Sequence, residues 1–167
     1  RSALLINAQT TRYAYTPVII GGLANWNGEG KQAREVFLPV KAIAAAPDGS
    51  VYALFTESSR IVRIAPSGVV TQVFRAGVTP FSPGVSALGV GLGPSTFTVS
   101  PDGVVYFADQ TRNRVFRLES DGTVSLVAGN GTRGFSGDTK AAIDAQLSTP
   151  WSMAAGSDRT LYFADNN

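Results

Sequence analysis

Two segments of the chain repeat each other without a gap, and this repeat constrains the fold more than any other feature of the sequence. Residues 50–64 read SVYALFTESSRIVRI and residues 104–118 read VVYFADQTRNRVFRL, at an offset of 54 residues. Each segment is preceded by Pro-Asp-Gly and followed by a second glycine turn. A third copy begins at residues 157–159 and continues through residues 160–167, at an offset of 56 residues. Self-similarity at such a period indicates stacked supersecondary units.

The second half of the third copy matches the other end of the sequence. Residues 1–6 align with residues 112–117, and residues 16–22 align with residues 123–129. Counted from turn to turn, and across the termini, the repeats are 54, 56 and 57 residues long and account for all 167 residues. We therefore expect one domain over residues 1–167, with repeats at about 16–64, 69–118, and 123–167 continued by 1–7.

Four short strands are expected in every repeat, because β-branched and aromatic residues recur at period two between Asp-Gly and Ser-Gly turns. The expected strands are 40–46, 50–55, 60–65 and 69–74 in the first repeat, 96–100, 104–109, 114–119 and 123–128 in the second, and 151–155, 160–165, 3–7 and 13–20 in the third. Helical periodicity is weak and predicts at most a helical turn within residues 30–37 and 139–147.

Three four-stranded units of about 55 residues predict an all-β fold, a β-propeller with three blades per chain. Propellers have four to eight blades, and six is the multiple of three within that range. The sequence therefore predicts a six-bladed ring formed by a head-to-tail homodimer, with one blade completed in trans. The alternative is that the chain is half of a single six-bladed protein.

Composition removes several classes of function. The chain has neither cysteine nor histidine, which excludes thiol enzymes, disulfide scaffolds, histidine-bound zinc and serine–histidine triads. A net charge of +2 makes nucleic acid an unexpected partner. The uncharged stretch 76–101 holds four prolines and five glycines, so no membrane span is expected there. The first residue is Arg1, which suggests a processed chain or a piece of a longer protein; the compartment stays open, with an extracellular or periplasmic parent favoured.

The segment 127–153, VAGNGTRGFSGDTKAAIDAQLSTPWSM, followed by LYFAD, resembles the NHL-repeat propellers. Their blades commonly read V-A-G-x-G-x-x-G-[FY]-x-G-D-G-x-x-A-x-x-A-x-L-x-x-P-x-G-[IVM], then L-Y-[VI]-A-D and an N-R-[IV] run, which residues 113–115 match. The residues in the first pattern are Gly129, Gly131, Gly134, Phe135, Gly137, Asp138, Ala142, Ala145, Leu147, Pro150 and Met153. The usual histidine is absent, and Thr139 and Ser152 replace glycines. The resemblance covers all three repeats and implies the fold. It does not imply one function, because these propellers serve as binding platforms, sensor ectodomains and occasionally enzymes.

Two motifs that suggest ligand chemistry are interpreted as structural. Residues 129–134 match GxGxxG, but no helix is expected to open behind them, so we place this loop between blades. The Pro-Asp-Gly turns carry one carboxylate each and lie a whole blade apart, which suits a capped hairpin turn better than a calcium site. No cofactor is expected, with Ca²⁺ as the alternative.

The candidate binding residues lie in two kinds of loop that emerge on one face of a propeller. These are the loops between the second and third strands and the connections between blades, where rigid scaffolds often carry function. The candidates are Trp26, Glu29, Glu57, Arg60, Gln110, Arg112, Arg133, Phe135, Asp138 and Asn166. Trp26 and Phe135 could instead plug gaps between blades, and Trp151 is expected to pack between blades. The uncharged segment 78–93 is expected to cover the channel, contact a partner, or lie buried against the next blade.

The first functional hypothesis is a non-enzymatic binding or assembly module that presents this loop-rich face to a protein, peptide or glycan. The second is a propeller hydrolase or lyase, with a metal held by carboxylates and amides in the central channel. The expected innermost strands, VKAIAAA, TFTVS and WSMAA, carry no carboxylate and count against it. An RNA-binding surface lacks the charge it would need. A final hypothesis is a half-propeller whose main property is self-assembly into a six-bladed ring.

Overall fold

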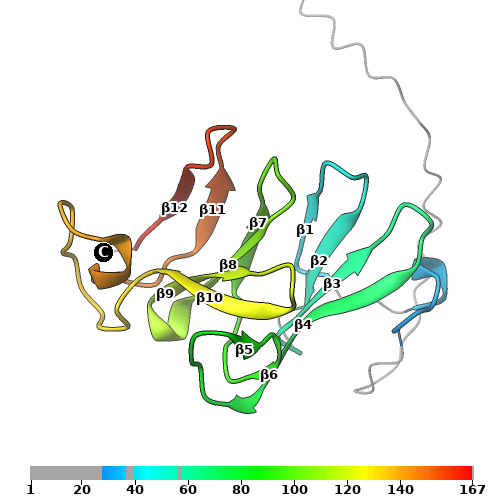
Figure 1. Cartoon of the computed structure of the whole chain (residues 1–167), viewed down its shortest axis with the longest axis horizontal. Helices are drawn as coiled ribbons and strands as arrows, with labels where there is room; N and C mark the ends of the chain where they lie inside the picture. Colours follow the sequence, from blue (N-terminus) through cyan, green and yellow to red (C-terminus); the bar gives the residue numbers. More distant parts are fainter. Residues whose placement is uncertain (1–27, 37–39, 56–57, 167) are drawn as a thin grey trace, which may run out of the picture.

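The computed structural model describes residues 28–36, 40–55 and 58–166, and in these ranges the chain is built from short β-strands (Figure 1). The strands are β1 (Ala42–Ala45), β2 (Val51–Phe55), β3 (Arg60–Ile64), β4 (Val70–Thr79), β5 (Val85–Ser86), β6 (Leu88–Val90), β7 (Thr96–Val99), β8 (Val105–Asp109), β9 (Arg114–Leu118), β10 (Thr123–Ala128), β11 (Ser152–Ala155) and β12 (Leu161–Ala164). Three single 3₁₀ turns accompany them: η1 (Ala33–Glu35), η2 (Gln110–Arg112) and η3 (Ala142–Asp144). The all-β prediction is confirmed, and η1 and η3 lie in the two segments expected to hold a helical turn.

Each of the first two repeats forms an antiparallel blade. Blade 1 has the strand order β1-β2-β3-β4 and blade 2 the order β7-β8-β9-β10, as the strand spacing predicts. Blade 3 contributes β11 and β12. Its expected third and fourth strands, 3–7 and 13–20, lie outside the described residues.

The hairpin turns between the first and second strands of the three blades lie together, at the top of Figure 1. We call this side the turn face and the opposite side, where strands two and three are joined, the connection face. On the turn face, carboxylates cap their turns: Asp48 Oδ1 accepts from the Ser50 N–H at 2.9 Å, and Asp158 Oδ1 accepts from the Thr160 N–H at 3.0 Å. Of these turns, only those at Asp48 and Asp102 are Pro-Asp-Gly. Asp102 accepts from the Ser100 hydroxyl, and Gly49 and Gly103 both have positive φ, so each Pro-Asp-Gly carboxylate bonds within its own turn, as the structural interpretation requires.

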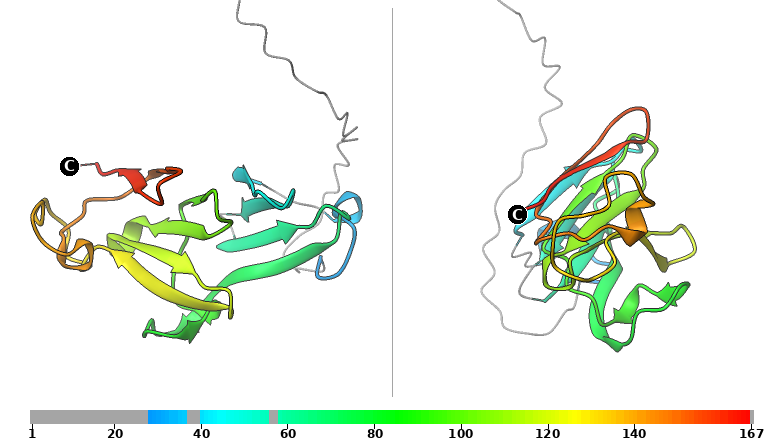
Figure 2. Two further views of the ribbon diagram at one scale, coloured as in Figure 1. Left: turned by 45° about the horizontal axis from the view of Figure 1, so that its top comes forward. Right: turned by 90° about the vertical axis from the view of Figure 1, so that its left-hand side faces the viewer.

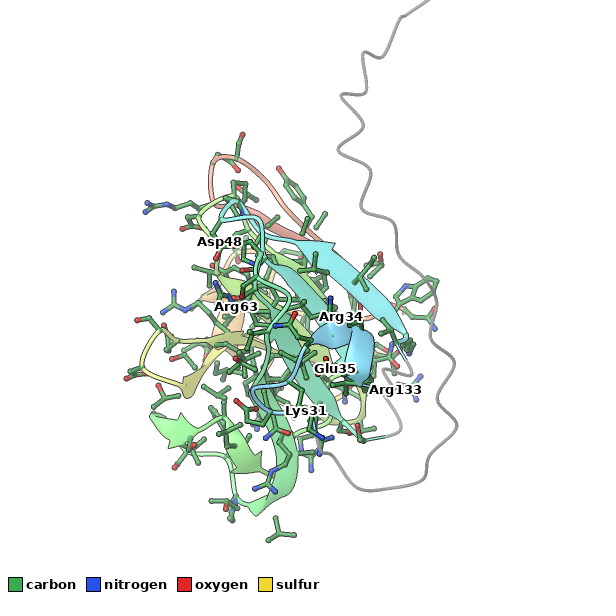
Figure 3. The ribbon with its side chains drawn as sticks, turned by 90° about the vertical axis from the view of Figure 1, so that its right-hand side faces the viewer. Lys31, Arg34, Glu35, Asp48, Arg63 and Arg133 are labelled. Carbon is green, nitrogen blue, oxygen red and sulfur yellow. The ribbon has the colours of Figure 1, made fainter. Side chains whose placement is uncertain are left out.

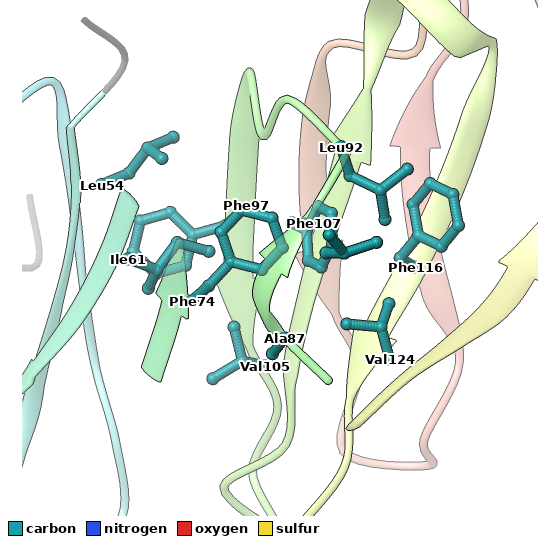
Figure 4. Packing of buried hydrophobic residues seen from close by; sticks show 11 residues of the cluster. Leu54, Ile61, Phe74, Ala87, Leu92, Phe97, Val105, Phe107, Phe116 and Val124 are labelled. Carbon is teal, nitrogen blue, oxygen red and sulfur yellow. The ribbon is translucent and has the colours of Figure 1, made fainter. Parts of the chain in front are cut away.

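The blades stack side by side through apolar faces. Between blades 1 and 2 the rings of Phe74 and Phe107 lie 5.0 Å apart, and Phe107 stacks on Phe116 at 5.4 Å (Figure 4). A smaller cluster between blades 2 and 3 contains Leu147 and Phe163. Burying a phenylalanine side chain contributes about 1.5–3 kcal/mol, so these inter-blade contacts stabilise the arc.

The uncharged segment 78–93 joins blade 1 to blade 2 as an added pair of strands. β6 pairs in parallel with the end of β4, and β5 pairs with β10 on the outer edge of blade 2. Ala87 and Leu92 are buried in the core between the blades, while the Val78 side chain is 96% exposed. Of the three expectations for this segment, burial against the next blade is the one confirmed. We call residues 77–93 the clasp.

At the two ends of the arc, apolar residues are exposed at positions whose equivalents in the middle of the arc are buried. Ile43 and Phe97 occupy the same place in the first two repeats, but Phe97 is 7% exposed against blade 1 and Ile43 is 69% exposed. At the other end, Ala164 is exposed although the equivalent Ala108 is 0% exposed, and Tyr162 is 59% exposed. Trp151 was expected to pack between blades, but it directly precedes β11 and is 58% exposed. Within residues 28–36, 40–55 and 58–166, no blade covers either outer face of the arc.

Candidate functional site

A buried carboxylate organises the connection face of blade 2. Asp109 closes β8, is fully buried, and accepts from the N–H groups of Thr111 and Arg112 at 3.1 and 3.2 Å. It also accepts from the Thr111 hydroxyl at 2.6 Å, from Arg112 Nη1 at 2.8 Å, and from the Gly93 N–H at the end of the clasp at 2.8 Å. The bonds from the Thr111 and Arg112 N–H groups cap η2 and fix Gln110 and Arg112 on this face. Asp109 therefore has a structural duty that leaves no free acceptor for catalysis.

A second carboxylate, that of Asp165, is held by hydrogen bonds between blades 2 and 3. Both oxygens of Asp165 accept from the Ser148 N–H at 2.7 and 2.8 Å, and the Asn166 N–H returns a bond to the Ser148 carbonyl at 2.8 Å. Arg133 Nε donates to the Ser148 hydroxyl at 3.2 Å. The neighbouring Thr149 N–H donates to Asn113 Oδ1 at 3.1 Å. We call this meeting point of the connection, β12 and the β8–β9 turn the Ser148 junction; it brings together the candidates Arg133 and Asn166.

The connection over residues 129–151 carries the other candidates of this region. Its GxGxxG motif packs against blade 2, because the Arg114 guanidinium donates to the Asn130 carbonyl at 2.8 Å and lies over Gly131. A Cβ at Gly131 would lie 3.0 Å from Arg114 Nη2, so the structural interpretation of this motif is confirmed. Phe135 is 66% exposed and does not plug a gap between blades in the described structure, while Asp138 is exposed in a turn farther out.

The candidates of the first repeat lie apart from that junction. Glu29 lies on the outer edge of blade 1, where its carboxylate accepts from the Gln72 N–H at 2.8 Å. Arg60 begins β3 opposite Arg75, and its pKa is lowered, first by burial and then by the charge of Arg75. Trp26 and Glu57 lie outside the described residues. The structure thus brings Arg133 and Asn166 together at the Ser148 junction and leaves Glu29 on a different edge.

A hollow of about 490 Å³ opens on the turn face between blades 1 and 2, which sequence reasoning did not single out. Its lining residues are Tyr52, Gln72, Val73, Ser86, Leu88, Val104, Val105, Leu118, Glu119, Ser120, Asp121 and Gly122. Beside it the Arg63 guanidinium contacts Asp48 at 2.7 Å, and this hydrogen bond lowers the pKa of Asp48 to about 2 (Figure 3). The lining comes from both blades and from Ser86 and Leu88 of the clasp, so no local sequence motif predicts this hollow.

The acidic groups that border the hollow are also engaged within the fold. A hydrogen bond from Ser125 is the first cause that lowers the pKa of Glu119, and Arg117 donates to the same carboxylate at 2.6 Å. Hydrogen bonds from the Thr123 hydroxyl and N–H lower the pKa of Asp121. These carboxylates hold turns in place and stay ionised, which favours surface recognition over acid–base chemistry.

Two surveys of the described ranges bear on function. Within residues 28–36, 40–55 and 58–166, no three histidines, cysteines or carboxylates lie close enough to hold a metal ion. None of the helical segments in this part of the chain has the length and apolarity required to cross a bilayer.

Comparison with known proteins shows the fold and not the family. No family model matches the chain. Over 150 residues, 82% of the chain, it is 29% identical to Teneurin-m of Drosophila melanogaster, of which it spans 5%. It superposes on an auxiliary nutrient binding protein from Bacteroides thetaiotaomicron with a TM-score of 0.56 and 21% identity, covering 74% of this chain and 34% of that one. For virginiamycin B lyase from Staphylococcus aureus the TM-score is 0.49 at 22% identity, with 76% and 34% covered.

The similarity to the Bacteroides protein agrees with the blade architecture, and the fold is that of a β-propeller. The chain spans about a third of the solved structures named above and a small part of Teneurin-m. The likeness to the solved structures carries the fold alone, because fold does not imply function.

Proposed function

We propose that this chain is a non-enzymatic binding module, an NHL-type β-propeller whose connection face recognises a protein, a peptide or a glycan. One observation carries the proposal. The carboxylates of Asp109 and Asp165 on this face accept from N–H groups of the connections between blades, whereas Arg112, Arg133, Phe135 and Asn166 remain exposed there. Arginine and aromatic side chains on a rigid scaffold are frequent binding anchors.

The arrangement supports recognition more than catalysis. The innermost strands β1, β7 and β11 contain no carboxylate, so a channel metal would need ligands from loops. The alternative is a hydrolase or lyase with a carboxylate- and amide-bound metal such as Ca²⁺. It predicts a large rise in melting temperature when Ca²⁺ is added, because a ligand that binds only the folded state stabilises it.

A glycan array and a displayed random-peptide library are the probes that test the binding proposal. Sequences or sugars enriched on the wild-type chain are then measured against Arg133→Ala and Phe135→Ala by biolayer interferometry. Because interface hot spots cost about 2 kcal/mol or more when truncated, at least one variant is expected to weaken binding roughly 30-fold.

Two exposed positions away from the connection face serve as matched controls. Arg159→Ala removes an arginine that is 82% exposed on the turn face, and Val78→Ala removes an apolar side chain that is 96% exposed in the clasp. Both are expected to bind like wild type. Loss of binding in the controls with retention in Arg133→Ala and Phe135→Ala would refute the proposed face.

We also propose that the module acts as a six-bladed ring of two copies. The support is the pair of open apolar faces at the ends of the arc, with Ile43 exposed at one end and Tyr162 at the other. A head-to-tail dimer would bury both faces with one kind of interface. The melting temperature should then rise with protein concentration, whereas Tyr162→Glu should lower it and flatten that dependence. A wild-type melting temperature independent of concentration would contradict the dimer.

A further inference from the structure

The hollow between blades 1 and 2 combines an apolar surface with polar groups. The clasp joins the two blades beside it, with β6 paired to β4 and β5 paired to β10 (Figures 1 and 2). Val73, Val105 and Leu118 line the hollow and belong to the core between the blades or pack against it. The volume of about 490 Å³ falls within the range of small-molecule sites, roughly 300–1,000 Å³. The hollow therefore has the size and the firm apolar surface that a small ligand needs.

The charge of this lining is negative. Glu119 and Asp121 are its charged residues, and hydrogen bonds lower both pKa values, so both carboxyl groups are ionised at neutral pH. Glu119 is compensated, because Arg117 Nε and Nη2 donate to its Oε1 at 2.8 and 2.6 Å. Asp121 Oδ1 accepts only from the Thr123 N–H and hydroxyl, at 3.0 and 2.7 Å. Among the described residues no lysine or arginine forms an ion pair with Asp121, so its charge is available to a cation.

On the side of blade 1, a polar group of the lining lacks a partner. Gln72 in β4 lines the hollow, and its Oε1 is buried without a hydrogen-bond donor among the described residues. The backbone N–H of Gln72 is used elsewhere, since it donates to Glu29 at 2.8 Å. A buried acceptor without a donor is unfavourable, and native structures rarely leave one without a role. A ligand with several N–H donors could pair with Gln72 and Asp121 together.

We propose that the hollow binds a primary ammonium group on a short aliphatic chain, which donates to Asp121 and Gln72 while its methylenes lie on Val73 and Leu118. An ammonium group has three donors and no acceptor, which matches a lining that offers acceptors and no basic side chain. A metal ion fits less well, since no three carboxylates of the described structure lie close enough to hold one. This site is separate from the connection face and does not depend on the proposed ring.

Titration of the full chain with 1,5-diaminopentane tests the proposal, with 1,5-pentanediol as an uncharged probe of the same length. Methyl resonances in two-dimensional NMR spectra report binding, and those of Val73 and Leu118 are expected to shift. For a ligand of this size the dissociation constant should be on the order of 1 mM. A diamine that causes no saturable shift, or a diol that causes an equal one, would overturn the proposal.

Asp121→Asn and Asp158→Asn form a matched pair of variants. Each carboxylate accepts from the N–H and hydroxyl of a threonine two residues later, and asparagine can keep such a turn. Asp121→Asn should raise the dissociation constant about 10-fold, because hydrogen bonds to charged groups are the stronger ones. Asp158 does not line the hollow, so Asp158→Asn should bind like wild type. Equal affinities of the two variants, with β-sheet retained by circular dichroism, would refute the site.

Gln72→Met tests the second contact, because methionine has a similar length and no amide. This variant should weaken binding about 3-fold while its melting temperature stays equal or rises, since the buried acceptor is gone. An unchanged affinity would overturn the assignment of Gln72.

Two blocked tripeptides, with central lysine or central norleucine, distinguish the sources of the ammonium group. The lysine peptide binding more tightly than the diamine would identify a lysine side chain of a peptide, and the reverse order would identify a free amine. Both results support the proposed chemistry. Equal binding of the lysine and norleucine peptides would contradict it, because norleucine carries no ammonium group.

Discussion

The two described connections between blades perform the same topological task with different chemistry. The clasp between blades 1 and 2 is uncharged, adds β6 to one blade and β5 to the other, and buries Ala87 and Leu92 in the core. The connection 129–151 between blades 2 and 3 has a single 3₁₀ turn and is held by polar contacts at the Ser148 junction. Only the second connection exposes arginine and phenylalanine to solvent in the way a binding face requires.

Both connections nevertheless end in the same way. The Gly93 N–H at the end of the clasp donates to Asp109, and the Ser148 N–H donates to Asp165 at the equivalent point of the next repeat. In blades 2 and 3, the carboxylate that follows or ends the second strand thus fixes where the innermost strand of that blade begins. The difference between the connections lies before this point, so each can be altered without changing the blades.

The largest expected effect comes from the first glycine of each connection. A Cβ at Gly77 would lie 2.2 Å from the Gly89 carbonyl oxygen, and one at Gly129 would lie 2.2 Å from the Asn113 carbonyl oxygen. Because backbone must move apart, Gly77→Ala and Gly129→Ala should each lower the free energy of unfolding by about 3 kcal/mol or more. Chemical denaturation measures this. Gly93→Ala is the matched control, since nothing lies within 4 Å of its Cβ; equal losses at all three positions would contradict the account.

Next in size is the effect of the carboxylates that end the two connections. Asp109→Asn should cost about 3 kcal/mol, because it leaves several buried donors poorly paired. Asp165→Asn should cost about 1 kcal/mol, because Asp165 is only partly buried and accepts from the Ser148 N–H alone among its described partners. Thermal unfolding of the two variants tests the order. A larger loss for Asp165→Asn would mean that the Ser148 junction contributes more to the stability of the folded chain than the bond between the clasp and Asp109.

A smaller loss of stability is expected when an apolar side chain is removed from the clasp, and almost none when one is removed from the connection 129–151. Phe81 in the clasp packs edge-to-face on Phe116, with ring centroids 5.0 Å apart. Phe81→Ala should therefore cost about 1–2 kcal/mol, since it loses a partly buried ring and an aromatic pair. Ile143→Ala in the other connection should change stability by less than about 0.5 kcal/mol, because Ile143 is 48% exposed. Similar losses in urea titrations of both variants would remove the distinction.

The smallest effect concerns acid. The clasp contains no titratable group, so acid sensitivity near blade 1 must arise elsewhere. The hydrogen bond from Arg63 lowers the pKa of Asp48 to about 2 in the folded chain, below its usual value of 3.8. A depressed carboxyl pKa contributes stability above the unfolded value, and this contribution is lost as pH falls from about 4 towards 2. Asp48→Asn should therefore flatten the stability curve slightly in that window, and an unchanged slope in melting experiments across it would contradict this.

The sequence was sufficient for the blades and insufficient for the clasp. The strands were predictable because the alternation of apolar residues survives in both complete repeats, down to the left-handed residues Ser59 and Asn113 at equivalent positions. The clasp was not, because two- and three-residue strands carry too little pattern and owe their pairing to long-range contacts with β4 and β10.

The candidate site was predictable in part for the same reason. Arg133 and Asn166 could be placed on one face because propeller topology fixes where their loops emerge. The role of Ser148 could not, because it depends on hydrogen bonds between residues 15 and 17 positions apart. The first repeat differs from the later two at this position, since Phe55 stands where they have Asp109 and Asp165. Sequence alone could not tell whether Glu29 joins the other candidates, because its place on the outer edge of blade 1 follows from contacts with β4.

The central claim is that the arc with two open faces closes by pairing with a second copy of the same chain. The mass in solution, measured by multi-angle light scattering on a sizing column, tests it most directly. The account predicts twice the chain mass of 17.5 kDa at micromolar concentration. A mass equal to that of one chain, unchanged as the concentration rises, would contradict it.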